Sequence, residues 1–200
     1  MLEGTVSSQK HSSATGQKLV GVQSILTVVI PVSALILAIL SGNRLFLDYM
    51  HVLPGALWTG IDLFMGLVIG RIMGQLDVRS RVEFIKRLVP YMLFLMPTLA
   101  AVTVTGGIYL AMNKGIFNIT YPVIILAGVF VIILIIQGLG IFLPNEVRIF
   151  FEIQKPNPDY GKIARLGMIN FKLSGLQGVF QIALIFIMAN IATGNYFLHF

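Results

Sequence analysis

Three residues of one apolar segment carry side chains that can do chemistry, and their spacing places them together. His51, Trp58 and Asp62 are separated by seven and then four residues. At about 100° per residue, these intervals bring all three onto one stripe of an α-helix. Histidine is a common ligand of haem iron, and a carboxyl group in an apolar helix is costly unless it faces a bundle interior or a cavity. The stripe predicts a site with His51 as an iron ligand and Asp62 in a proton-conducting layer.

Each of these residues also has a purely structural interpretation. His51 would then be a histidine hydrogen-bonded near the membrane interface, with Asp48 as its partner. Asp62 would be a protonated carboxyl group, hydrogen-bonded to Gln137 or Gln177, that specifies packing. Trp58 would contribute packing rather than chemistry.

The composition is that of an integral membrane protein. Of the 200 residues, 56% are hydrophobic and 11% are charged, whereas soluble domains carry about 25% charged residues. Five apolar runs are long enough to cross a bilayer, namely 19–41, 46–73, 88–112, 121–143 and 168–192. We therefore predict an all-α polytopic membrane bundle of about five helices, in which a four-helix core follows one extra N-terminal span.

The rest of the chain leaves room for one domain. Residues 1–18 are polar and unpatterned, which predicts a flexible cytoplasmic tail before a single transmembrane domain over 19–200. The chain has no cysteine, which excludes disulfides, thiolate metal sites and iron–sulfur ligation. Its net charge of +6 comes from basic residues in short connectors, which points to membrane topology and not to nucleic acid.

The connector charges predict an orientation. Basic residues gather between the second and third runs and between the fourth and fifth, whereas the connectors after the first and third runs hold only Arg44 and Lys114. The two basic groups are Arg71, Arg79, Arg81, Lys86 and Arg87, and Arg148, Lys155, Lys162 and Arg165. Cytoplasmic connectors carry an excess of Lys and Arg. We therefore expect a multi-pass plasma-membrane protein with its N-terminus in the cytoplasm and its C-terminus outside.

Polar residues of several spans are expected at one depth. Counting inward at about 1.5 Å per residue predicts a polar layer near the midplane. It comprises Asp62, Thr98, Gln137, Gln177 and Gln181. Lys172 points away from this stripe and is expected to extend toward the membrane surface instead of pairing with Asp62.

Nearer the outer side, His51 is expected at the level of Gly106, Gly107 and Met188. Adjacent glycines expose backbone to a close neighbour, which is either another helix or the flat edge of a cofactor. Haem held by His51 would be five-coordinate or would take a thioether, with Met188 or Met112 as the sixth ligand. We count His51, Met188, Gly106 and Gly107 as candidate cofactor-binding residues.

Two patterns concern packing and helix ends. Gly66, Gly70 and Gly74 continue the stripe of Asp62 at four-residue intervals, which predicts close packing of a neighbouring helix. Pro144 is expected to end or cap the fourth span, with a short interfacial helix over 146–153.

The run His51-x6-Trp58-x-Gly60 resembles the opening-helix motif of small membrane proteins related to the copper-resistance D and membrane-bound protoporphyrinogen oxidase families. The pair Lys172-Leu173 is similar to a Lys-Leu pair in those families. The resemblance implies a helical bundle associated with haem b, with His51 as a candidate axial ligand.

Three functions remain open at this point. The first is a redox-associated protein that holds haem b or a quinone in the bundle. The second is a noncatalytic subunit of a larger, respiratory-type membrane complex, with other membrane subunits or further copies of the chain as partners. The third is a small proton-coupled transporter, because a polar midplane layer also suits proton coupling.

Overall fold

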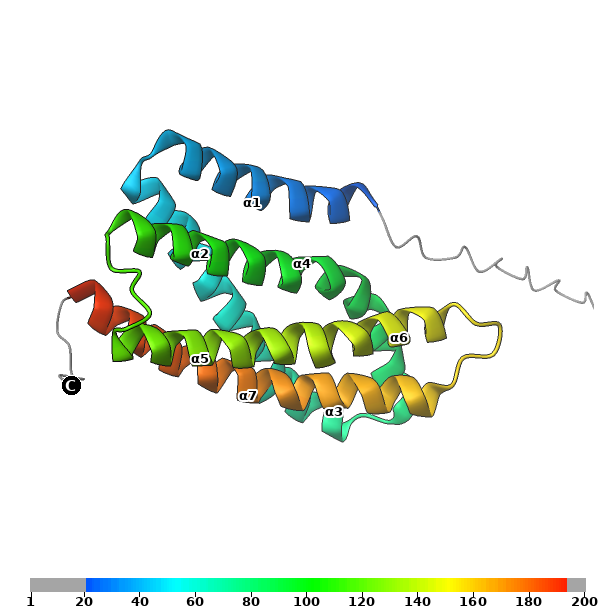
Figure 1. The fold of residues 1–200 in the computed structure, drawn as a ribbon. Helices are drawn as coiled ribbons and strands as arrows, with labels where there is room; N and C mark the ends of the chain where they lie inside the picture. Colours follow the sequence, from blue (N-terminus) through cyan, green and yellow to red (C-terminus); the bar gives the residue numbers. More distant parts are fainter. Residues whose placement is uncertain (1–20, 194–200) are drawn as a thin grey trace, which may run out of the picture.

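Long apolar helices make up the described part of the chain, residues 21–193 of the computed structural model (Figure 1). Five helical segments have the length and hydropathy needed to cross a membrane: Val22–Ser41, Arg44–Gln75, Val78–Asn113, Pro122–Ile153 and Tyr160–Thr193. Over the described range the chain forms no strand. The prediction of an all-α, multi-pass membrane bundle is confirmed. The predicted tail, 1–18, lies outside the described residues.

Two of the five segments contain a π-helical turn. The elements in chain order are α1 (Val22–Ser41), α2 (Arg44–Phe64), η1 (Met65–Ile69), α3 (Gly70–Gln75), α4 (Val78–Asn113), α5 (Pro122–Gln137), η2 (Gly138–Phe142), α6 (Leu143–Ile153) and α7 (Tyr160–Thr193). A π-turn adds a residue to the helical repeat and is frequent at functional sites. The turns η1 and η2 therefore change which face each span presents beyond them.

The expectation that Pro144 ends the fourth span was wrong. Pro144 stands in the first turn of α6, which continues directly from η2. Within a continuous helix a proline removes one backbone hydrogen bond, and the π-turn η2 stands directly before it at this irregularity. The segment 146–153 is accordingly the end of a long span and not a separate interfacial helix.

The helix α1 lies at the edge of the bundle, beside α2 and α4 (Figure 1). Only Leu35 and Ala38 of this helix are buried, and they pack with Leu47 of α2 and Val102 of α4. The other four spans form the core around α7, which contacts α2, α4, α5 and α6. This arrangement agrees with a four-helix core that follows one extra N-terminal span.

Side-chain caps fix the start of two spans. Asn43 accepts a hydrogen bond from the Phe46 N–H at the start of α2. Asp77 accepts hydrogen bonds from the Arg79 and Ser80 N–H groups and from the Ser80 hydroxyl at the start of α4. The bonds from Ser80, followed by that from Arg79, hold the pKa of Asp77 below its usual value. The tight turn between α3 and α4 is therefore closed by a charged cap.

Candidate functional site

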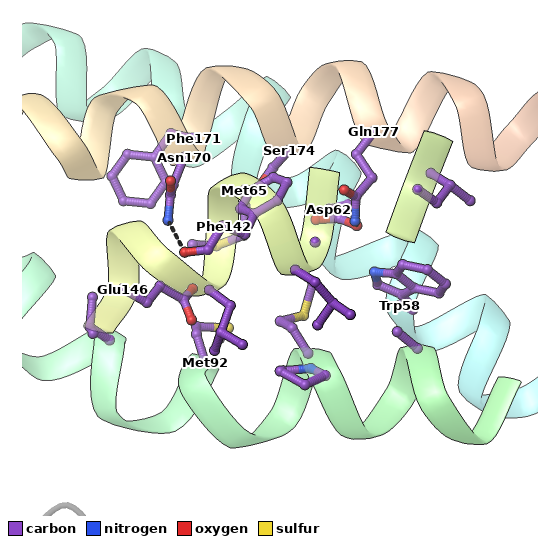
Figure 2. A pocket seen from close by; sticks show the side chains of 18 of the residues that line it. Trp58, Asp62, Met65, Met92, Phe142, Glu146, Asn170, Phe171, Ser174 and Gln177 are labelled. Carbon is purple, nitrogen blue, oxygen red and sulfur yellow. Dashed lines mark hydrogen bonds between the residues drawn. The ribbon is translucent and has the colours of Figure 1, made fainter. Parts of the chain in front are cut away.

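A pocket of about 300 Å³ lies inside the bundle, between α4 on one side and α5 to α7 on the other (Figure 2). Its wall is mainly apolar, and α4 supplies more of the lining residues than any other element. The polar lining residues are Trp58, Asp62, Thr105, Glu146, Asn170, Ser174 and Gln177. A mostly apolar pocket with a few convergent polar groups is the usual form of a small-molecule site.

The pocket opens sideways toward the lipid. The helix α5 packs mainly on α7, whereas α4 packs on α1, α2, α6 and α7, so no extended contact joins α4 to α5. Ala101 of α4, Ile135 of α5 and Leu139 of η2 line the pocket and are also exposed on the outer surface. These residues lie well inside their spans. An opening at this level of the spans would face the bilayer interior and not water.

Asp62 is completely buried, with 0% of its surface exposed. Its Oδ2 atom accepts hydrogen bonds from the Nε2 atoms of Gln177 and Gln181, at 2.9 and 3.0 Å. Its Oδ1 atom has no hydrogen-bond partner among the residues that the structure describes. Figure 2 shows Trp58 and Gln177 on either side of this carboxyl group. Asp62 is thus fixed by α7 while one of its oxygens stays unpaired.

Glu146 is the second carboxyl group of the pocket, and it enters from α6 (Figure 2). Its surface is 9% exposed, and it makes no hydrogen bond or ion pair within residues 21–193. A buried carboxyl group without a partner is costly, because burial removes its hydration. Glu146 is therefore the polar group of this pocket that most needs a ligand or a proton.

Sequence reasoning missed Glu146 because Pro144 was expected to end the span before it. A signal was present, since Glu146, Ile149, Phe150 and Ile153 follow helical spacing as a continuation of the fourth apolar run. Three of these four side chains are buried in the structure.

An asparagine pair joins α6 and η2 to α7 beside the pocket. Asn145 donates from Nδ2 to Oδ1 of Asn170, at 2.9 Å. Asn170 donates in turn to the carbonyl oxygen of Phe142, at 3.5 Å, the contact that is dashed in Figure 2. Both side chains are buried, so the pair holds the end of η2 at a fixed distance from α7.

The polar layer expected at the midplane is divided in the structure. Gln177 and Gln181 reach Asp62, as described above. Thr98 instead donates to the Phe94 carbonyl oxygen of its own helix, at 2.7 Å. Gln137 is buried, and its Oε1 atom has no hydrogen-bond partner in the described chain. Only α2 and α7 therefore contribute to the hydrogen-bonded cluster around Asp62.

His51 lies away from the pocket, against α4. Its Nδ1 atom is 2.8 Å from the carbonyl oxygen of Thr103, so Asp48 is not the partner that holds the ring. A Cβ atom added to Gly107 would stand 2.6 Å from Cε1 of His51, and one added to Gly106 would stand 3.4 Å from the His51 Cα. The two glycines therefore make room for His51 and its helix, not for the edge of a cofactor.

The residues expected to bind haem do not share a site. Met188 packs on Val123, Ala127 and Ile187, between α5 and α7. His51 packs on α4, and neither His51 nor Met188 lines the pocket described above. Met112 is exposed near the end of α4. The pairs proposed for His/Met ligation therefore do not fit a haem in this bundle.

Of the glycines expected to pack against a neighbouring helix, Gly66 and Gly70 do so and Gly74 does not. Gly66 meets the backbone of Gly175, and Gly70 lies beside Phe171, both on α7. Gly74 has open space around its Cβ position, so its expected place in the packing stripe is not found.

Comparisons with protein-family models, with curated proteins and with solved structures found no match to this chain. The fold and the pocket define a class: a helical protein with five candidate membrane spans and, among them, an apolar pocket that contains two carboxyl groups.

Proposed function

We propose that this protein binds a membrane-dissolved molecule of the quinone class in the pocket between α4 and α5, as part of a redox process. The observation that carries this proposal is the sideways opening of an apolar pocket that holds Asp62 and Glu146. Quinones are stored in the bilayer and combine an apolar body with a polar ring. Such a ligand would place its ring beside the two carboxyl groups and its tail in the lipid.

The size of the pocket supports a ring-sized ligand. Its volume of about 300 Å³ stands at the lower end of the range of roughly 300–1,000 Å³ that is usual for ligand pockets. One ring with its substituents fits such a space, whereas a long isoprenoid tail must leave by the opening next to Ala101.

The two carboxyl groups supply proton chemistry. Oxidation of a quinol to a quinone breaks two O–H bonds and releases two protons and two electrons. Asp62 and Glu146, each in its ionised form, would accept the protons, Asp62 through its unpaired oxygen. The electrons would pass to the redox centre of a partner membrane protein, in keeping with a respiratory-type complex. Haem ligation by His51 is left out of this proposal.

A second function has one specific observation in its favour. No basic side chain lines the pocket, while Trp58 and Glu146 both do. A lipophilic cation would find the indole face and an unpaired carboxylate there, and protons would exchange with it at Asp62 and Glu146. This is proton-coupled transport. The noncatalytic-subunit hypothesis has less support, since Gly66 and Gly70 serve contacts inside the chain.

We further propose that the protein resides in the plasma membrane with its N-terminus in the cytoplasm, on the strength of the connector charges. The chain lacks cysteine, so single cysteines introduced at Lys114 and Asn157 are specific probes. A membrane-impermeant maleimide should label the first from outside intact cells and the second only after lysis. The opposite pattern would reverse the orientation.

Trp58 makes the ligand hypotheses directly testable, because it is the only tryptophan of the chain and it lines the pocket. The protein in lipid nanodiscs should show saturable quenching of Trp58 fluorescence by a short-tailed ubiquinone. The double variant Asp62→Asn/Glu146→Gln should weaken this binding by about tenfold or more, because it removes two polar contacts. Glu83→Gln, which alters an exposed carboxyl group outside the pocket, is the matched control and should bind as wild type.

Other outcomes separate the hypotheses. Saturable quenching by tetraphenylphosphonium that competes with protons, without quenching by the quinone, would favour transport of cations. Quenching that never saturates, or that is unchanged in the double variant, would reject both ligands for this pocket.

A further inference from the structure

A second hollow, independent of the first pocket, gathers basic side chains at the end of the bundle where α3 turns into α4. Its volume is about 550 Å³. The basic residues that line it are Arg71 of α3, Arg81 of α4, and Arg165 and Lys172 of α7. No acidic residue lines it. We call these four residues and the space between them the basic hollow.

The four cations have no carboxylate partner. The ion pairs of the described chain use Lys86, Arg87, Lys155 and Lys162, and none uses a residue of the basic hollow. Like charges that converge on one space repel each other, and near the membrane surface they are screened less than in bulk water. An anion in the hollow would remove this cost.

Arg81 is already held in place for such an anion. Its Nε atom donates to the Met73 carbonyl oxygen at 2.9 Å, and its Nη2 atom donates to the Leu76 carbonyl oxygen at 3.0 Å. These bonds use the free carbonyl groups at the end of α3, and the Nη1 atom has no hydrogen-bond partner within residues 21–193. A preorganised guanidinium loses less entropy when it binds an oxyanion.

The hollow has both room and an apolar wall. Gly70 and Gly74 bring no side chains into it, and the Cβ position of Gly74 is surrounded by open space. Met168 and Ile169 of α7 line it as well, and Ile169 is exposed on the outer surface. An occupant therefore meets positive charge and apolar surface side by side.

We propose that the basic hollow binds the phosphate headgroup of an anionic membrane lipid, whose acyl chains lie along Met168 and Ile169. Basic pockets between transmembrane helices at the cytoplasmic surface are suited to such headgroups. A lipid uses both the charges and the apolar wall, whereas a soluble phosphate uses only the charges. Arg71 and Lys172 lie near the ends of two candidate spans, Arg44–Gln75 and Tyr160–Thr193.

Native mass spectrometry of the purified full chain, in micelles that contain phosphatidylglycerol and phosphatidylcholine in equal amounts, tests this proposal. Wild type should retain phosphatidylglycerol as a bound adduct in preference to phosphatidylcholine. Arg165→Gln/Lys172→Gln should lower this preference by about tenfold or more. The control Arg79→Gln/Arg148→Gln removes the same charge from exposed residues outside the hollow and should keep the wild-type preference.

A charge-neutral variant provides a second test. Gly74→Leu fills the hollow without altering any cation, and the open space at its Cβ position predicts a folded protein. It should also lose the phosphatidylglycerol adduct. An adduct that survives in both Gly74→Leu and Arg165→Gln/Lys172→Gln would overturn the proposal. Displacement of the adduct by millimolar inorganic phosphate would assign the hollow to soluble anions instead.

Discussion

Two pairs of helices in the bundle differ in how closely they pack: η1 packs tightly on α7, whereas α4 and α5 are separated by a pocket. Where η1 crosses α7, a Cβ atom on Gly66 would stand 2.2 Å from the Cα and N atoms of Gly175, so backbone meets backbone. Between α4 and α5, large side chains such as Met96 and Leu134 keep the helices apart, and a pocket remains. Lipid gives helices little hydrophobic reason to associate, so close backbone approach carries much of the stability. The close contact of Gly66 with Gly175, called the glycine seam below, therefore lets α4 and α5 remain apart.

The largest expected loss of stability comes from a substitution in the glycine seam. Gly66→Ala puts a methyl group where Gly175 now lies, and overpacking of this kind costs about 1–3 kcal/mol or more. The unfolding temperature in detergent, followed by circular dichroism, should fall clearly.

Gly60→Ala is the matched control, because the Cβ position of Gly60 has open space. Alanine is the better helix former by about 1 kcal/mol, so this variant should be as stable as wild type or more stable. Equal effects of Gly60→Ala and Gly66→Ala would show that the seam does not carry the fold.

A smaller effect separates the two carboxyl groups of the pocket. Asp62→Leu leaves the amide groups of Gln177 and Gln181 without their acceptor, and a hydrogen bond between membrane helices contributes about 0.6 kcal/mol on average. Glu146→Leu removes no hydrogen bond within the described chain and relieves an unpaired buried carboxyl group. Thermal unfolding should therefore show a loss of stability for Asp62→Leu and none for Glu146→Leu.

Asp62→Asn refines this comparison, because it keeps one acceptor oxygen and should lie between wild type and Asp62→Leu. If Glu146→Leu is the more damaging of the two leucine variants, Glu146 has a structural partner and is not held ready for a ligand.

The smallest effect on stability is expected at the rim of the pocket between α4 and α5. Ala101→Phe places a ring at the exposed rim of the pocket, where it should obstruct entry while leaving the unfolding temperature unchanged. Quenching of Trp58 by a ubiquinone should weaken several-fold. Ala56→Phe changes an exposed residue of α2 outside the pocket and should leave quenching unaltered. Similar quenching in both variants would argue against entry between α4 and α5.

The sequence was sufficient for the spans but only partly for the site. Runs of apolar residues report hydrophobic length directly, so all five spans were predicted with their order. The depth count also placed Gln177 and Gln181 level with Asp62, because rise per residue is nearly constant along a helix. Depth does not fix the direction in which a side chain points, however, and Thr98 bonds within its own helix.

The remaining errors come from helix phase. A π-turn has no clear sequence signature, so η1 and η2 were not foreseen, and each changes the face of every residue that follows it. Glu146 was missed for a related reason, since Pro144 reads as a helix end although it begins α6 within a continuous span. His51 was predicted as a haem ligand partly from a resemblance to a family motif. In the structure its ring fills the space that Gly106 and Gly107 leave.

The sideways opening of the pocket has a consequence for how affinity must be expressed. A ligand that enters between α4 and α5 is drawn from the bilayer and not from water. Its occupancy then depends on its mole fraction among the lipids, so adding empty vesicles at constant total ligand dilutes it. A ligand enriched in the membrane would fill such a pocket even if its contacts with the protein were weak. Selectivity then rests on the few polar groups at its inner wall.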